Sequence, residues 1–284
     1  NKPQHFAMNL KPLLISFAVL LALPNFIRED INEQLPFNNT ERYHPVLKAI
    51  NSVDKLEKFV DAEAVSRKID IHSPQYSLLL AYFISCRFYH GFSHYKMNEN
   101  WIAAVGEKFT GIGLSCKVQP DEILKHPNAA CSQQALVMME ILKRKKIDYR
   151  KVGFPHHYAL EVRSNGNWYY FDPNMEPDMN LSQRLHESWS ASNDSLKKYY
   201  SAAKHPNLSY QFGTGETAIF GTVNEVPAKR LRFFQSSTAV LSKIAWCFPL
   251  LFLFARKRKP GMYALKPVNN DPGFSSNLNP LFSA

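Results

Sequence analysis

The spacing of hydrophobic and polar positions changes within residues 128–173, and the change predicts a helix followed by a hairpin. From Leu136 to Lys146, apolar residues recur three and four positions apart, which is typical of a helix with one buried face. Between Tyr158 and Phe171, apolar and polar residues alternate, which indicates half-buried strands. Asn165-Gly166 divides these strands, and this dipeptide favours a two-residue hairpin turn.

The turn also predicts which side chains share a face of the hairpin. If the turn is centred on Asn165-Gly166, Asp172 lies opposite Ala159, and His157 lies diagonally across from Asp172 on the same face. Successive strand residues point to opposite faces, so His156 is expected to face away from Asp172. A loop of odd length would reverse this choice. In the simpler alternative, the Asp-Pro pair only ends a strand and the two histidines are a solvated strand start.

Cys131 precedes this hairpin and opens the predicted helix. Basic residues crowd the last turn of the helix, where cations suit the negative end of the helix dipole. A thiol at the opposite, positive end is easier to ionise, and the thiolate is the nucleophile. Cys131, His157 and Asp172 are therefore candidates for nucleophile, base and orienting carboxylate. The alternative is a buried structural cysteine, because a free cysteine behaves as a small hydrophobic residue.

These residues form a pattern that resembles a known group of enzymes. A cysteine opens a helix, His157 stands four residues before Glu161-Val162, and Trp168 and Asp172-Pro173 follow on the next strand. As a set, the pattern resembles the transglutaminase-like superfamily, which includes transglutaminases, bacterial transglutaminase-like cysteine peptidases and peptide N-glycanases. The resemblance covers roughly residues 75–176 and is fairly specific as a set.

Two positions depart from the family pattern without removing a reacting group. Ala130 stands where many members have Gly, and Tyr158 stands where a small residue is common. The resemblance implies an α+β, papain-like fold, with a helical N-terminal lobe and the Cys131 helix packed on an antiparallel sheet.

The resemblance also suggests residues around the reacting groups. Trp101 is a counterpart of the tryptophan whose indole N–H helps to bind the oxyanion in animal transglutaminases. The alternative is that Trp101 is an aromatic of the core or rim in the helix predicted over 100–109. Gln133 and His156 are weaker candidates for the rim of the site.

The implied chemistry is attack by a thiolate on an amide carbonyl of a peptide or protein, through an acyl-thioenzyme. A peptidase or amidase is the first expectation, acyl transfer to an amine the second, and a non-catalytic binding or scaffold module the third. No cofactor is expected. No metal site is expected either, since His90 and His94 share helical spacing without a third ligand at metal spacing.

Apolar segments flank the predicted catalytic region on both sides. Pro12 to Ile27 and Ala239 to Ala255 are nearly continuous apolar runs, and a basic cluster, Arg256–Lys259, follows the second. By the positive-inside rule, both chain ends are expected in the cytosol, and the catalytic domain outside it, at an inner or plasma membrane. The first run is also short enough for a signal peptide or a buried helix.

The expected division of the chain follows from these runs. It comprises an N-terminal anchor or signal segment (1–27), a catalytic domain (28–180), a connector or accessory lobe (181–236), a transmembrane segment (237–255) and a basic, disordered tail (256–284). The net charge of +10 is attributed mainly to the membrane flanks, and without a nucleic-acid motif no nucleic-acid partner is expected. In an exported domain, Cys86 and Cys116 are candidates for a disulfide, although both also fit buried thiols.

Overall fold

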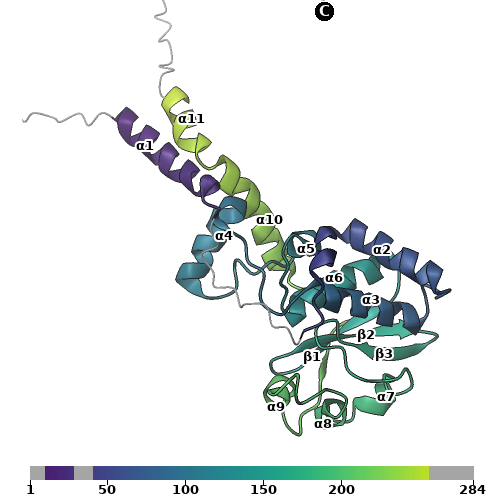
Figure 1. The fold of residues 1–284 in the computed structure, drawn as a ribbon. Coiled ribbons are helices and arrows are strands. Elements are labelled where there is room, and N and C mark those ends of the chain that lie inside the picture. The colour runs from purple at the N-terminus through teal and green to yellow at the C-terminus, as the bar shows by residue number, and fades with distance from the viewer. Residues whose placement is uncertain (1–9, 29–40, 256–284) are drawn as a thin grey trace, which may run out of the picture.

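The computed structural model describes residues 10–28 and 41–255, which form an α+β fold of helices around a small sheet (Figure 1). The predicted tail, 256–284, with its basic cluster, lies outside the described residues. The elements in chain order are α1 (Leu10–Ala22), η1 (Leu23–Phe26), η2 (Pro45–Ala49), α2 (Val53–Ser66), α3 (Pro74–Arg87), α4 (Met97–Thr110), α5 (Pro120–Leu124), α6 (Cys131–Arg144), β1 (Tyr149–Gly153), β2 (Tyr158–Ser164), β3 (Asn167–Phe171), α7 (His186–Trp189), α8 (Asn193–Lys197), α9 (Leu208–Phe212), β4 (Ile219–Phe220), α10 (Lys229–Ile244) and α11 (Cys247–Ala255).

The sheet is antiparallel throughout, in the order β3-β2-β1-β4. Ser164 pairs with Asn167 across the β2–β3 turn, so the predicted register is confirmed. Asn165 and Gly166 both have positive φ, 48° and 82°, as a type I′ turn requires. The turn type therefore determines which side chains reach each face of the hairpin.

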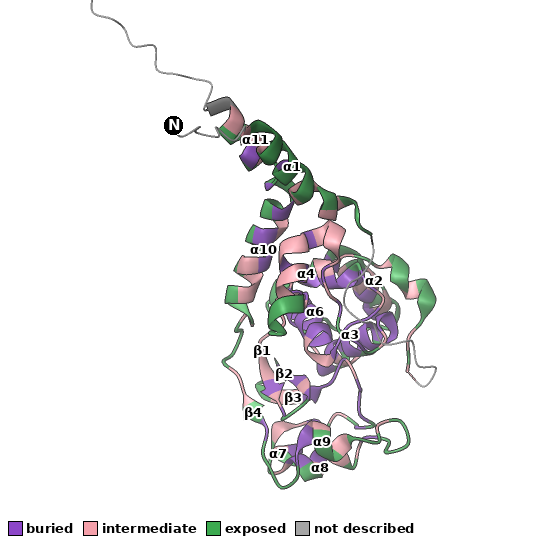
Figure 2. Ribbon diagram, turned by 90° about the vertical axis from the view of Figure 1, so that its left-hand side faces the viewer, coloured by how far each residue is buried: buried purple, intermediate pink, exposed green. Residues whose placement is uncertain are grey.

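One face of the sheet packs against helices. α3 and α6 lie on β2, and α2 packs against both helices. Their apolar residues, with Leu160 and Phe171 of the sheet, form one continuous buried cluster. Every residue of α6 from Gln133 to Leu142 except Glu140 is buried, which makes the Cys131 helix a central element of the core (Figure 2).

The opposite face of the sheet is covered by the chain that follows β3. Val152, Ala159 and Tyr170 of the sheet cluster with Trp189, Phe212 and neighbouring apolar residues from α7, α8 and α9. β4 joins the sheet beside β1. Residues 181–236, expected to be a connector or accessory lobe, thus supply the second layer of the core, and the predicted boundary at 180 does not separate two structural units.

A narrower part of the molecule extends away from the sheet (Figure 1). α1 packs against α11, and α4 packs against both α10 and η1. α10 runs without interruption from Lys229 to Ile244, so the boundary predicted at 236 falls inside a helix. Within 10–28 and 41–255, no single helix is long and apolar enough to cross a membrane; α10 and Cys247–Leu253, bent by 52°, reach that length and composition only as a pair.

All four cysteines are free thiols, so the Cys86–Cys116 disulfide is not present. Cys86 is buried near the end of α3, whereas the sulfur of Cys116 lies 3.6 Å from Nδ1 of His94. Burial raises the pKa of the Cys116 thiol to about 12, with Glu107 adding to the effect. Cys116 is therefore protonated at neutral pH, and the expectation that it pairs with Cys86 is corrected.

Candidate active site

The hairpin brings an imidazole and a carboxylate together. His157 immediately precedes β2 and Asp172 immediately follows β3, so the confirmed register places both at the same end of the hairpin. Nε2 of His157 lies 2.6 Å from Oδ2 of Asp172, a short, charge-assisted contact. Both residues are buried, with exposed fractions of 5% and 0%. The predicted pair is thus a contact in the structure.

Asp172 is held by donors on both carboxylate oxygens. Oδ1 accepts the backbone N–H groups of Asn174 and Met175, each at 3.0 Å, and Oδ2 accepts the hydroxyl of Tyr200 at 2.8 Å beside His157. Burial alone would raise the pKa of this carboxyl, but His157 and the hydrogen bonds outweigh burial and lower it. Asp172 is therefore ionised at neutral pH and fixed in orientation.

Tyr200 is the site residue that sequence reasoning missed. Its hydroxyl also contacts that of Tyr170 at 2.8 Å, which extends the hydrogen-bonded chain from Asp172 into the second core. Burial, and then the charge of Asp172, raises the pKa of both phenols, so both stay protonated as donors. Tyr200 lies in a stretch without any recognisable motif, and only its aromatic neighbour Tyr199 marks the position.

Cys131 is the first residue of α6 and is half-buried. Its side chain interacts with that of His157 and contributes to the raised pKa of His157. Because Nε2 of His157 faces Asp172, the other ring nitrogen, Nδ1, is left for the thiol. His157 therefore lies between Cys131, which interacts with it, and Asp172, which it contacts directly.

The charge state of His157 follows from its two partners. Burial is the largest effect and opposes protonation, but the Asp172 carboxylate and then the Cys131 side chain together raise the pKa of His157 to about 10. The imidazolium form therefore dominates at neutral pH.

His156 takes no part in these contacts. It is exposed, its ring stacks on that of Tyr210 at 3.9 Å between centroids, and its backbone N–H bonds to the carbonyl of Gln211. His156 therefore lies against α9. The choice of His157 over His156 agrees with the structure.

Gln133 holds backbone segments together through hydrogen bonds and is not a free donor at the rim of the site. Its Nε2 donates to the carbonyls of Ser93 and Lys117, at 2.9 and 2.8 Å. Its Oε1 accepts the N–H of Ser93 at 2.8 Å and that of Ala130 at 3.1 Å. Both amide protons are thus used inside the protein, and the expectation that Gln133 serves the oxyanion or the rim is corrected.

Trp101 does not lie with the triad either. Its indole N–H donates to the carbonyl of Ser242 on α10 at 3.0 Å. The ring lines a small apolar pocket with Leu14, Phe17 and Phe248, where α1 and α11 meet α4. A tryptophan at a suitable sequence distance from Cys131 can still point away from it, because sequence distance does not fix the direction of a side chain on a helix. Trp101 is a packed aromatic, as the alternative interpretation has it.

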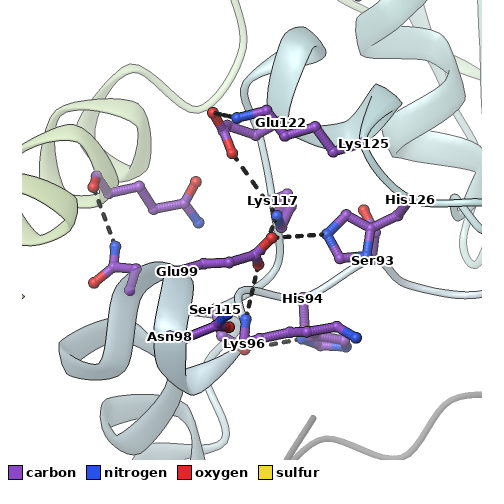
Figure 3. A network of polar contacts seen from close by, with 12 residues as sticks. Ser93, His94, Lys96, Asn98, Glu99, Ser115, Lys117, Glu122, Lys125 and His126 are labelled. Carbon is purple, nitrogen blue, oxygen red and sulfur yellow. Dashed lines mark hydrogen bonds and ion pairs between the residues drawn. The ribbon is translucent and has the colours of Figure 1, made fainter. Parts of the chain in front are cut away.

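A partly buried network of charged and polar side chains supports the loop that leads to Cys131 (Figure 3). Nζ of the fully buried Lys117 lies 2.9 Å from Oε2 of Glu99. Oε1 of Glu99 lies 3.4 Å from Nε2 of His126, a few residues before Cys131. Gln133 binds the backbone of Lys117, so this network and the start of α6 are held as one unit.

Glu161 and Trp168, the other residues of the family pattern, have structural roles. Glu161 is fully buried, with its carboxylate 2.7 Å from Nη2 of Arg150 and 2.8 Å from Nδ1 of His186. The Arg150 guanidinium also lies over the Trp168 ring at 4.5 Å. These contacts tie β1, β2 and β3 to α7 and thereby stabilise the hairpin that carries His157 and Asp172.

A cavity of about 1060 Å³ adjoins the triad. Asn174, Met175 and Tyr200 line it, and these are the residues that donate to Asp172. Cys131, His157 and Asp172 themselves are not among its lining residues. Within the described part of the chain, no group of three His, Cys, Asp or Glu residues is arranged to hold a metal ion.

Comparison with known proteins adds no assignment to this geometry. No family model, no curated protein and no solved structure matches the chain.

Proposed function

We propose that the protein is a transglutaminase-like cysteine enzyme that cleaves amide bonds of peptides or proteins through an acyl-thioenzyme. The observation that carries this proposal is the contact of His157 with Asp172 at 2.6 Å, together with the interaction of the Cys131 side chain with His157. Each of these side chains has a distinct chemical task, and a non-catalytic module does not require all three groups. The packing of α6 against β2, with Cys131 at the helix start, supports a papain-like arrangement.

In the proposed reaction, the Cys131 thiolate attacks the carbonyl carbon while His157 carries the proton taken from the thiol. The carbonyl electrons move to oxygen, and the tetrahedral intermediate collapses when His157 transfers its proton to the departing amine. Water then attacks the thioester with His157 as base, and the acid and the free thiol are regenerated. Asp172 stabilises the imidazolium and fixes the tautomer throughout.

The oxyanion needs donors near the sulfur. Cys131 is the first helical residue, so its backbone N–H has no partner within the helix and points toward the N-terminal end. This N–H, at the positive end of the helix dipole, is the proposed donor to the developing oxyanion. The indole of Trp101 is not part of the proposal, since it bonds to Ser242.

Hydrolysis and transfer differ only in the group that resolves the acyl-thioenzyme, water or an amine. The test is therefore a turnover assay on peptide amides with and without an added primary amine, followed by mass spectrometry of products and of quenched enzyme. An adduct on wild-type Cys131 and free acid as the product support a peptidase or amidase. An amide with the added amine would make the transferase the better description. The absence of turnover and of any adduct would reject the enzyme.

The location that we propose is a membrane surface. α1, α10 and α11 carry exposed apolar side chains such as Leu20, Phe233 and Phe252, with exposed fractions of 60, 77 and 55%. Large exposed apolar surfaces of this kind mark contact with lipid or with another protein. Together with the basic residues of the tail, they support anchoring to a membrane with the triad on the far side from the cytosol.

A further inference from the structure

The cavity beside the triad is lined by both apolar and polar residues. On one side it is lined by α3 and the loop after β3, with Leu79, Phe88, Met175 and Met179 buried among its apolar residues. These side chains offer no hydrogen bonds, so they suit the hydrocarbon part of a ligand. A polar group on such an apolar wall therefore fixes the orientation of a bound ligand and determines which ligand is preferred.

Glu176 is that polar group. It lines the cavity and is 8% exposed. Oε1 accepts a hydrogen bond from Nη2 of Arg184 at 2.5 Å, whereas Oε2 is buried without a hydrogen-bond partner in the described part of the chain. Leaving a buried carboxylate oxygen unpaired costs free energy that a bound donor would recover. The backbone N–H of Glu176 bonds to the carbonyl of Asp172, which ties this position to the triad.

Arg184 does not turn the wall into an anion site. Nε donates to the carbonyl of Met179 at 3.2 Å, Nη1 to that of Tyr170 at 3.0 Å, and Nη2 to Pro177 as well as to Glu176. The guanidinium is buried and used to fold the loop after β3. The buried wall therefore presents an acceptor, and the charges at the rim, among them Arg42 and Lys204, are exposed and screened by water.

We infer that this cavity binds a substrate side chain that has an apolar stem and a terminal N–H donor, and that Oε2 of Glu176 accepts a hydrogen bond from that donor. Lysine, with an ammonium, and glutamine, with a carboxamide, both have this chemistry. The inference rests on the proposed function, because the ligand is a side chain of the same peptide substrate. Glu176 acts here as a specificity-determining residue, separate from the reacting groups.

The pKa of Glu176 determines how the affinity of the cavity for its ligand should depend on pH. Burial raises the pKa of this carboxyl to about 7, although the Arg184 guanidinium acts in the opposite direction. An N–H donor binds the ionised carboxylate, so affinity for a donor rises as pH rises through about 7. A ligand that offers only acceptors would require protonated Glu176, and its affinity would rise as pH falls.

Binding is measured on the full-length Cys131→Ala protein, which does not turn peptides over. The probes are dansyl-labelled tripeptide amides that differ only in a central lysine, glutamine, norleucine or glutamate. A hydrogen bond to a charged acceptor predicts that the lysine or glutamine probe binds about tenfold or more tightly than the norleucine probe. Glu176→Gln should remove most of this preference. Asp178→Asn, which changes an exposed carboxylate of the same cavity, is the matched control and should preserve it.

Each outcome decides the inference. Tightest binding of the lysine probe or of the glutamine probe supports it and tells which donor is preferred. Equal binding of the norleucine probe, tightest binding of the glutamate probe, or no binding of any probe overturns it. If Glu176→Gln fails to fold, the pH profile of the Cys131→Ala protein decides, because affinity that does not rise through about pH 7 contradicts a donor on Glu176. A donor preference without turnover by the wild-type protein would reject the proposed function and leave this binding site standing.

Discussion

At the scale of single residues, Asp172 depends on a hydroxyl from a distant part of the chain. Tyr200→Phe removes the 2.8 Å hydrogen bond to Oδ2 and leaves the Tyr170 hydroxyl without its partner. We expect the free energy of unfolding to fall by about 1–3 kcal/mol and turnover to fall about tenfold, because the carboxylate is less well held. Tyr199→Phe, a half-buried neighbour that lines the same cavity, is the control. Denaturant unfolding and steady-state kinetics measure both effects; a Tyr200→Phe protein equal to the control in both would contradict the role.

The two adjacent histidines are expected to behave differently. His157→Ala removes the general base, so turnover should fall by about a thousandfold or more, since triad members act as a unit. His156→Ala removes a ring that stacks on Tyr210, and turnover should fall by about tenfold or less. Asp172→Asn should lie between them, because the imidazole remains without its enforced tautomer. Steady-state rates on one peptide amide measure all three, and a dead His156→Ala protein with an active His157→Ala protein would reverse the assignment.

Residue-level prediction succeeded where local geometry controls a side chain. Asn165-Gly166 fixes the register, and the register alone brings His157 to Asp172. Tyr200 could not be predicted, because its contact with Asp172 depends on how the chain after β3 folds back over the sheet, and no local pattern encodes that path. The direction of the Trp101 indole depends likewise on packing against α10.

At the scale of elements, the start of α6 is fixed by Gln133. Gln133→Ala leaves backbone groups of Ser93 and Lys117 unpaired in a buried region, so the free energy of unfolding should fall by about 3 kcal/mol. The same change should alter kcat of the folded enzyme by less than about threefold, whereas loss of an oxyanion donor costs about 10²–10³-fold. Thermal unfolding and kinetics at low temperature separate the two roles. Ser132→Ala, at the neighbouring half-buried position, is the control for both.

A kcat that collapses in Gln133→Ala while stability is unchanged would restore Gln133 to the oxyanion site. Gln133 lies two positions after Cys131 on the same helix, as the sequence predicts. What the sequence did not provide was the partner segment around Ser93 and Lys117, which comes from an earlier part of the chain. Elements defined by their own periodicity, such as α6 and the β2–β3 hairpin, were predicted; the loops that they hold were not.

At the scale of the whole molecule, α1, α11 and the C-terminal part of α10 form a narrow end that lies away from the sheet (Figure 1). If this end anchors the chain in a membrane, a reporter fused after Asn207 should be active outside the cytosol. A reporter fused after Asn270, which lies outside the described residues, should be active inside it. The paired activities of a phosphatase and a fluorescent-protein reporter measure this. The reverse pattern would reject the proposed orientation.

The second layer of the sheet also belongs to the whole molecule. Residues 181–236 carry no motif, yet they bring Tyr200 to Asp172 and Trp189 to the core. The sequence left open whether they are a connector or an accessory lobe, because short helices such as α7, α8 and α9 leave weak periodicity in a sequence. A domain boundary inferred from a motif alone thus cut through a structural unit.

The central claim is that Cys131 is an activated nucleophile, and site-resolved alkylation tests it most directly. Cys116, Cys131 and Cys247 are all half-buried, so exposure alone does not distinguish them. Of the three thiols, Cys131 interacts with the protonated His157, so the proposed function predicts that Cys131 reacts first. An ordinary thiol is almost fully protonated at mildly acidic pH and reacts slowly. Iodoacetamide treatment at that pH, followed by peptide mass mapping, should label Cys131 first, and His157→Ala should abolish this selectivity. Labelling of Cys131 no faster than Cys247, or unchanged selectivity in His157→Ala, would contradict the account.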